Sequence, residues 1–206
     1  PALRPDHVVH EVEERGEPVV PVGHHAEHDK AMGFCFLNNV AIAARHALEV
    51  HGLERVAIVD FDVHHGNGTE NIFRDDPRVM MVSIFQHPFY PYSGADSKAA
   101  HMVNVPVTAG LRGDAFRQIV SEVWLPALRN HNPQMLFISA GFDAHYEDDM
   151  GSCGLVESDY VWTTEQLKKL IEECGHRRVV SLLEGGYALS ALARSVVAHI
   201  KALADL

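Results

Sequence analysis

The sequence has little of what several protein classes require. Only three of its 206 residues are cysteines (Cys35, Cys153 and Cys174), and they form neither a CxxC pair nor an even-numbered disulfide framework. No apolar run approaches the roughly 18–20 residues of a membrane span. Lys and Arg number 17 against 28 Asp and Glu, a formal net charge of −11. We expect a globular protein of a reducing compartment, the cytoplasm, that binds no membrane and no nucleic acid directly.

Several familiar catalytic signatures are also missing. The sequence has no GxSxG nucleophile elbow, no P-loop and no GxGxxG dinucleotide motif. It begins at Pro1 without a signal peptide, and we expect an N-terminal piece to be absent. By contrast, it holds 15 dispersed histidines. Histidine is the commonest metal ligand and the side chain that most readily exchanges protons near neutral pH.

Apolar runs and helical periodicity alternate along the chain. Five short runs rich in β-branched residues predict buried parallel strands at residues 18–22, 55–61, 79–85, 134–140 and 178–183. Helical patterns lie at residues 37–50, 114–130, 156–174 and 190–204. Residues 86–113 have no clear periodicity and are expected to form a long loop. The pattern predicts one α/β domain with helices on both faces of a parallel sheet.

Polar residues follow four of these predicted strands. In a parallel sheet the carboxyl ends of the strands share one edge, where sites form. The residues delivered to that edge are His24 and His25, then Asp60, Asp62, His64 and His65, then Asp143, and finally Glu184 to Tyr187. This convergence predicts a polar site at that edge.

The segment DFDVHHGNG indicates metal chemistry. Asp60, Asp62 and His64 alternate with apolar residues, so their side chains share one face if the strand persists. Zinc accepts oxygen and nitrogen ligands, and burying neighbouring carboxylates without a cation is unfavourable. Asp143, in GFDAH, is a candidate further ligand. The alternatives are a solvated loop at the strand end and, for Asp143, a turn or N-cap residue.

Three other features have both a catalytic and a structural interpretation. The tandem His24 and His25 could act as a general acid and base, serve as ligands, or simply fill space. Tyr187, after two glycines, could donate to a developing oxyanion or pack in a turn. Phe34 could line a channel or belong to the core.

Four ordered segments together resemble one enzyme family. They are GHHAEHDKAMGFCFLNNVAIAA, VAIVDFDVHHGNGTENIF, ISAGFDAH and LEGGY. They are similar to the zinc-dependent histone deacetylase family, including its bacterial class II-like members and the acetylpolyamine amidohydrolases. The resemblance implies an arginase/deacetylase-like three-layer α/β/α sandwich with a mainly parallel sheet. It also implies that residues 1–206 are the C-terminal portion of a single deacetylase catalytic domain.

The resemblance also implies residue roles. Asp62, His64 and Asp143 would bind one catalytic Zn²⁺, and Tyr187 would stabilise the oxyanion. Asp60 would hold His24 and Asn67 would hold His25, with His25 as the general base and His24 assisting electrostatically. Gly33, Phe34, Tyr90 and Met150 would line or border the substrate channel. One or two structural K⁺ ions are implied, the first at Asp60, Asp62, His64, Ser83 and Ile84, and the second near Phe73 and Val79.

The function implied is removal of acetyl or other acyl groups from N-acetyl-lysine side chains of a peptide or protein, by metal-activated water. An acetylpolyamine amidohydrolase is the close alternative. Met150, seven residues after Asp143, stands where an acid would favour polyamines, which mildly favours acetyl-lysine. A truncated, non-catalytic family member and a manganese arginase-like hydrolase are further alternatives. A homo-oligomer is compatible with each of these interpretations.

Overall fold

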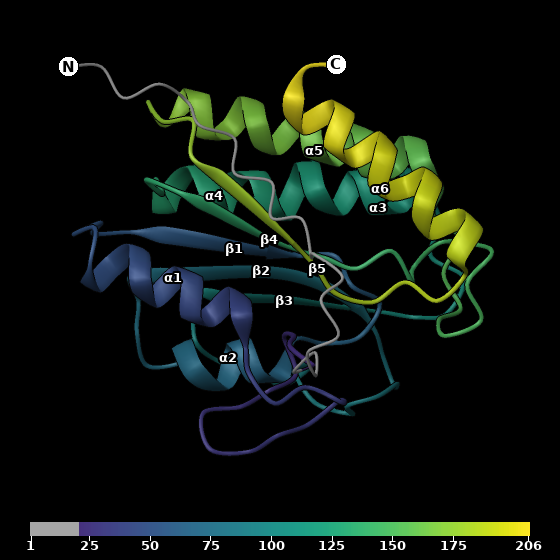
Figure 1. Ribbon diagram of the computed structural model, residues 1–206, viewed down its shortest axis with the longest axis horizontal. Helices are drawn as coiled ribbons and strands as arrows, with labels where there is room; N and C mark the ends of the chain where they lie inside the picture. The colour runs from purple at the N-terminus through teal and green to yellow at the C-terminus, as the bar shows by residue number, and fades with distance from the viewer. Residues whose placement is uncertain (1–20) are drawn as a thin grey trace, which may run out of the picture.

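The computed structural model describes residues 21–206 and contains a sheet of five parallel strands (Figure 1). The strands are β1 (Val56–Asp60), β2 (Val79–Gln86), β3 (Met102–Val107), β4 (Leu136–Ala140) and β5 (Val179–Leu183), in the order β3-β2-β1-β4-β5. The predicted strand at 18–22 lies mostly outside the described residues, and Val22 forms only an isolated bridge to Leu37.

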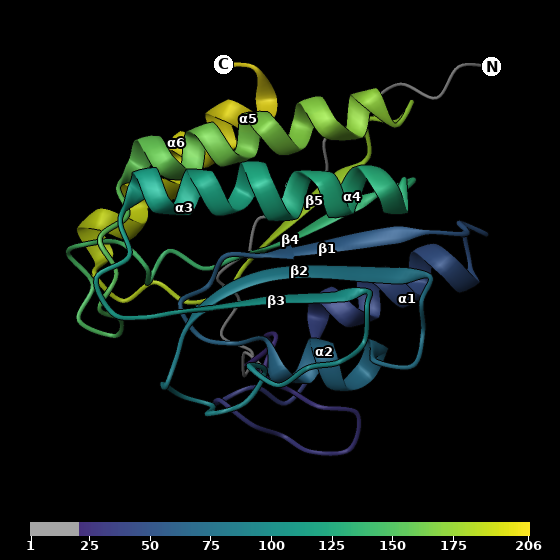
Figure 2. The same cartoon turned by 180° about the vertical axis from the view of Figure 1, so that it is seen from behind.

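The helices lie on both faces of this sheet. They are α1 (Asn39–Glu49), α2 (Asn67–Phe73), α3 (Gly113–Ile119), α4 (Leu125–His131), α5 (Glu157–Glu173) and α6 (Leu189–Ala204). Figures 1 and 2 show α1 and α2 on one face and the other four on the opposite face. Each face has its own buried apolar cluster, one of them centred on Trp124, Phe61 and Tyr160. The predicted three-layer α/β/α sandwich is therefore confirmed.

Four strands agree with the sequence prediction to within two residues. Strands β1, β2 and β4 are fully buried as predicted, whereas the predicted burial of β5 is wrong, because β5 is an edge strand and is only partly buried. The long loop predicted at residues 86–113 is wrong in part, since β3 lies within it. Strand β3 is an edge strand and contains Asn104 and Pro106. Proline cannot donate a ladder hydrogen bond and is tolerated at a sheet edge, so the strand forms although its sequence pattern is weak.

The helix predicted at residues 114–130 is interrupted. A five-residue π-helical turn, Val120–Trp124, separates α3 from α4, and Pro126 lies in the first turn of α4. Proline lacks an N–H and clashes with the carbonyl four residues earlier, so the wider turn before it accommodates the ring. The short helix α2 was not predicted, because its seven residues include a glycine and two asparagines.

The chain order defines where a site can form. From β1 the chain moves outward to β2 and β3, then returns to the other side of β1 to form β4 and β5. The chain therefore leaves β1 toward one edge of the sheet and leaves its neighbour β4 toward the opposite edge. In open parallel sheets, ligands bind beyond the carboxyl ends of the strands at the point where the strand order reverses in this way. Asp62 and His64 follow β1 and Asp143 follows β4, so all three lie at this reversal.

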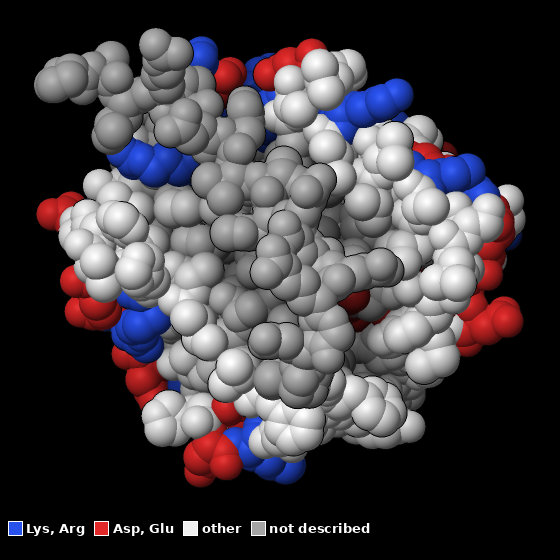
Figure 3. Space-filling model, in the orientation of Figure 1, with Lys and Arg blue, Asp and Glu red and all other residues white. Residues whose placement is uncertain are grey.

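Figure 3 shows both basic and acidic side chains around the margin of the face seen in Figure 1. On α6, Leu189, Val197 and Ile200 are exposed. No helix in residues 21–206 has the length and apolarity needed to cross a membrane.

Candidate active site

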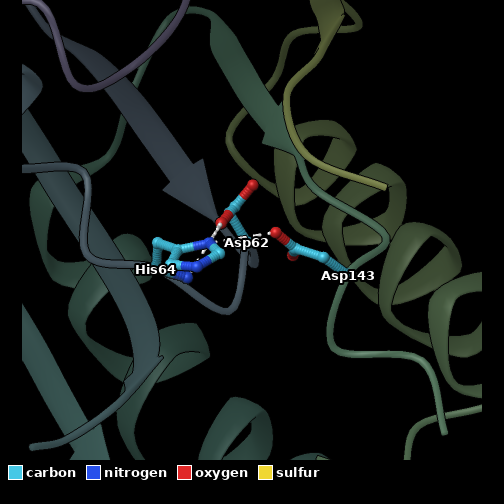
Figure 4. Close-up of side chains that lie close together, drawn as sticks. All are labelled: Asp62, His64 and Asp143. Atoms are coloured by element: carbon cyan, nitrogen blue, oxygen red, sulfur yellow. Dashed lines mark hydrogen bonds and ion pairs between the residues drawn. The ribbon is translucent and has the colours of Figure 1, made fainter. Parts of the chain in front are cut away.

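Three buried side chains form a compact cluster at the ends of β1 and β4 (Figure 4). One ligand-type atom from each of Asp62, His64 and Asp143 lies within 4.8 Å of the others. His64 Nδ1 is 3.1 Å from Asp62 Oδ1 and 3.0 Å from Asp143 Oδ2. The two aspartates are at most 1% exposed.

The donor set of this cluster fits a divalent metal ion. One Nδ1 hydrogen cannot satisfy two carboxylates, so the cluster as it stands is short of positive charge. Burial and the neighbouring charge of Asp62 raise the pKa of Asp143 to about 7. Burial lowers the pKa of His64, but hydrogen bonds to Asp143 and Asp62 outweigh it and raise the value to about 10. A cation among these oxygen and nitrogen atoms would relieve both effects, and Zn²⁺ accepts this ligand set.

Backbone groups fix the carboxylates in this cluster. Asp62 Oδ1 accepts the His64 N–H at 2.8 Å, and Asp143 Oδ1 accepts the Val63 N–H at 2.9 Å. Asp62 Oδ2 accepts the Gly185 N–H at 2.8 Å. A Cβ at Gly185 would collide with Asp143, so only glycine permits this close approach of the β5 end.

The tandem histidines lie beside the cluster, each with a different partner. His24 Nδ1 is 2.7 Å from Asp60 Oδ2, and His25 Nδ1 is 2.8 Å from Asn67 Oδ1. The two rings are 4.3 Å apart and at most 7% exposed. His24 Nε2 lies 3.8 Å from Asp62 Oδ1, so the histidine pair adjoins the candidate metal-ligand cluster.

The surroundings give the two histidines opposite protonation tendencies. Burial lowers the pKa of His24, but the charges of Asp60, Glu184 and Asp62 together raise it well above its usual value. Burial and the charge of His24 lower the pKa of His25 to about 3. The surroundings therefore favour the protonated form of His24 and the neutral form of His25.

Aromatic side chains surround the cluster on the outer side. Tyr90 packs edge-on against His25 at 5.1 Å, and Phe89 stacks on His64 at 5.3 Å. Phe34 is 94% exposed and has a left-handed backbone (φ 62°). Gly33 also has positive φ (57°), and a Cβ there would collide with the His25 ring. Gly33 and Tyr90 therefore lie directly against His25. The Phe34 side chain is exposed to solvent and is not part of the core.

Tyr187 and Met150 lie at the more open side of the site. Tyr187 is 55% exposed, and burial together with the charges of Asp62, Asp143 and Asp148 raises the pKa of its phenol. Its backbone N–H donates to Asp148 Oδ2 at 2.6 Å, and the Ala188 N–H donates to the same oxygen at 3.0 Å. Met150, 46% exposed, donates its N–H to Asp148 Oδ1 at 2.9 Å. The neutral phenol of Tyr187 can donate a hydrogen bond at the site.

Three further residues contribute to the site: the sequence placed Glu184 at the polar edge without a specific role and did not point to Asp148 or Phe89. Asp148 is 5% exposed and joins the loop after β4 to the segment that carries Tyr187. Glu184 accepts the His24 N–H at 3.0 Å and the Ser139 hydroxyl at 2.8 Å. Burial raises the pKa of Glu184 to about 7. Phe89 is the third. Glu184 lies in the LEGGY motif and Asp148 follows GFDAH, so motif position was the only available signal.

The residues assigned to potassium have other contacts in the structure. Ser83 Oγ donates to Asn104 Oδ1 at 3.0 Å, and Asp60 Oδ1 accepts the Asp62 N–H at 3.1 Å. The Phe73 carbonyl accepts the Asp76 N–H at 2.9 Å. Val79 begins β2, and Ile84 is buried within it. Both potassium sites remain predictions.

Two buried aspartates and a histidine at a sheet reversal, next to a histidine pair, offer oxygen and nitrogen ligands of the kind that hold a divalent metal ion. Residues 5–203 match the family model described as Histone deacetylase domain. The chain belongs to this family.

Individual relatives and a solved structure support the assignment. The chain is 42% identical over 201 residues to an uncharacterized protein of Synechocystis, covering 96% of this chain and 64% of that protein. It is 39% identical over 189 residues to chloroplastic Histone deacetylase 14 of Arabidopsis thaliana, covering 89% and 45%. The crystal structure of the HDA15 HD domain matches with a TM-score of 0.81 at 39% identity, covering 89% of this chain and 54% of that one. The chain thus spans about half to two thirds of these proteins.

Proposed function

We propose that the protein is a zinc-dependent deacetylase that hydrolyses the amide of N-acetyl-lysine side chains in peptides or proteins. The observation that carries the proposal is the convergence of Asp62, His64 and Asp143 beside the neutral imidazole of His25. Zinc held by these three residues would activate water and polarise the amide carbonyl.

The hydrogen-bond network supports His25 as the group that accepts a proton. Asn67 Nδ2 faces the His25 carbonyl oxygen at 3.3 Å and Glu27 Oε1 at 2.9 Å, so this atom is the amide NH₂. Asn67 Oδ1 therefore accepts from His25 Nδ1–H. The other ring nitrogen of His25, Nε2, is left with its lone pair and can take a proton from water and return it to the leaving amine.

His24 and Tyr187 have supporting roles in this proposal. His24 is held by Asp60, whose charge favours the protonated imidazole, so His24 would assist by supplying positive charge next to the cluster. The Tyr187 hydroxyl donates to the substrate carbonyl oxygen as negative charge develops there. This hydroxyl is protonated at neutral pH, because the pKa of the Tyr187 phenol is raised above its usual value.

The rim favours an acyl-lysine stem over a polyamine. Phe34, Tyr187 and Met150 present exposed apolar or aromatic surface, which suits the methylene chain of a lysine. Among the nearby acids, Glu147 pairs with Arg194 and Asp148 binds backbone N–H groups. An acetylated polyamine, which would need an acid free to bind its ammonium groups, is the second candidate, with Asp149 beside Met150 as the remaining acid of that loop.

The test measures deacetylation of a fluorogenic acetyl-lysine peptide, with N8-acetylspermidine in parallel, after metal removal and again after zinc is added. We expect peptide turnover that disappears with the metal and returns with zinc. Turnover of acetylspermidine alone would favour the polyamine reading. Zinc binding without turnover of either substrate would favour a non-catalytic, partner-binding role.

A further inference from the structure

We propose that Glu27 is a positioning residue that fixes the orientation of the Asn67 amide and thereby the tautomer of His25. The inference rests on the proposed function, in which His25 exchanges the proton. Glu27 belongs to the loop directly after the tandem histidines and touches no ligand of the metal cluster. It acts through Asn67 alone.

The first step of the argument concerns the amide. A side-chain amide can rotate by 180° and exchange its oxygen and NH₂ group. In the structure Asn67 Nδ2 faces three acceptors: Glu27 Oε1 at 2.9 Å, the His25 carbonyl at 3.3 Å and Met32 Sδ at 3.4 Å. The carboxylate is the strongest acceptor of the three, because a charged acceptor roughly doubles the strength of a hydrogen bond. Glu27 therefore holds the NH₂ group on its own side.

The second step concerns the imidazole. With its NH₂ group held by Glu27, Asn67 presents only Oδ1 to His25 Nδ1, at 2.8 Å. An oxygen requires a hydrogen from the ring, so neutral His25 carries its proton on Nδ1. A rotated amide would instead donate to Nδ1 and move the ring proton to Nε2. That tautomer cannot accept a proton at Nε2.

The third step concerns how firmly Glu27 itself is held. Its N–H donates to the Lys30 carbonyl at 2.9 Å, which closes a short turn at residues 27–30. The preceding backbone is fastened to α2 and α1, because the Thr69 N–H donates to the His24 carbonyl and Asn38 Nδ2 donates to the Ala26 carbonyl. Glu27 and Asn67 both line a cavity of about 620 Å³, so the carboxylate lies beside the amide without being enclosed in the core.

The experiment reads the tautomer directly and the activity separately. Nitrogen-15 NMR of histidine-labelled protein distinguishes Nδ1–H from Nε2–H imidazole, and a His25→Gln variant identifies the His25 signals by subtraction. We expect Nδ1–H in the unsubstituted protein and loss of that preference in Glu27→Lys, whose ammonium cannot accept from Asn67. Turnover of the acetyl-lysine peptide should fall about 10- to 100-fold in Glu27→Lys. Glu27→Gln, which keeps an acceptor oxygen, should retain most activity.

Two further variants make the test specific. Asp29→Lys makes the same charge change at an exposed position of the same turn and should alter neither readout. Asn67→Asp alone places a carboxylate against Glu27 and should reduce turnover, and adding Glu27→Lys should then restore it at least severalfold. Glu27→Lys should thus lower turnover when residue 67 is Asn and raise turnover when residue 67 is Asp.

The inference is overturned if Glu27→Lys leaves the His25 tautomer unchanged, or lowers turnover equally with Asn or Asp at position 67. If the tautomer changes as expected but the unsubstituted protein hydrolyses no acetyl-lysine peptide, the positioning role stands and the proposed function fails.

Discussion

The inner and outer sides of the candidate site differ in burial and in how firmly hydrogen bonds fix their side chains. On the inner side, Asp62, His64, Asp143 and the tandem histidines are at most 7% exposed and are fixed by backbone or side-chain hydrogen bonds. On the outer side, Phe34, Tyr187 and Met150 are 46–94% exposed. The fold therefore determines the positions of the ionisable groups, whereas the surface that would contact substrate is open. The following predictions test whether chemistry and substrate binding divide along this line.

The largest effect is expected at the metal-ligand cluster. Asp143→Asn keeps the hydrogen-bonding shape but removes a ligand charge, so turnover should fall below detection. At pH 8 the metal-free protein should nevertheless melt about 3 °C or more higher, because the variant no longer buries a charged carboxylate beside Asp62. Calorimetry without and with zinc checks this, and zinc should stabilise only the unsubstituted protein. A lower melting temperature of the metal-free variant would contradict this account of the cluster.

The next largest effect separates the two histidines. His25→Ala removes the proposed proton acceptor and should lower kcat about 1,000-fold, within the range for a general base. His24→Ala should lower it less, because His24 supplies charge rather than a proton. Steady-state kinetics of both variants at equal zinc content make the comparison. Near-normal turnover by His25→Ala would assign the base elsewhere.

A smaller loss of kcat is expected when Tyr187, on the outer side of the site, is changed. Tyr187→Phe removes one hydrogen-bond donor to the developing oxyanion and should lower kcat about 100-fold. Bound zinc, measured by elemental analysis, should stay the same, because the Tyr187 side chain is not one of the proposed ligands. Unchanged kcat would remove Tyr187 from the mechanism and leave the outer side to binding alone.

Asp148 connects the inner and outer sides, and its removal should act through Tyr187. Asp148→Ala leaves the N–H groups of Tyr187 and Ala188 without their acceptor and should lower kcat about tenfold. Adding Tyr187→Phe should then reduce kcat less than it does alone. Asp159→Ala, which also removes a buried carboxylate that accepts a backbone N–H, is the matched control. Fully additive losses would show that Asp148 acts independently of Tyr187.

The smallest effect is expected at the rim. Phe34→Ala should change the free energy of unfolding by less than about 0.5 kcal/mol, because the ring is 94% exposed. KM for the acetyl-lysine peptide should rise severalfold while kcat stays close to normal. Denaturant unfolding and steady-state kinetics measure the two quantities. A large loss of stability would mean that this side chain belongs to the core after all.

The sequence was most informative where burial and chemistry coincide. Strands β1, β2, β4 and β5 were predicted because continuous apolar runs are typical of buried parallel strands. The polar residues at their ends indicated the site, since such strands share one edge. The motif resemblance then supplied the individual roles, and the structure places Asp62, His64 and Asp143 together.

The sequence was uninformative where structure depends on contacts between distant segments. Strand β3 gains its place by pairing with β2, although Asn104 and Pro106 weaken its pattern. The contacts of Glu184 with His24 and of Asp148 with Tyr187 span 160 and 39 residues. No local pattern encodes such approaches, because they follow from how loops meet at the edge of the sheet.

The most direct test of the central claim is the zinc content of the protein after equilibrium dialysis against zinc, measured by elemental analysis. We predict one zinc ion per chain for the unsubstituted protein and for Asp159→Asn, and less than about 0.1 per chain for Asp143→Asn, since removing one of three ligands abolishes most affinity. Zinc retained at full stoichiometry by Asp143→Asn, or absent from the unsubstituted protein, would contradict the assignment of this cluster as the metal site.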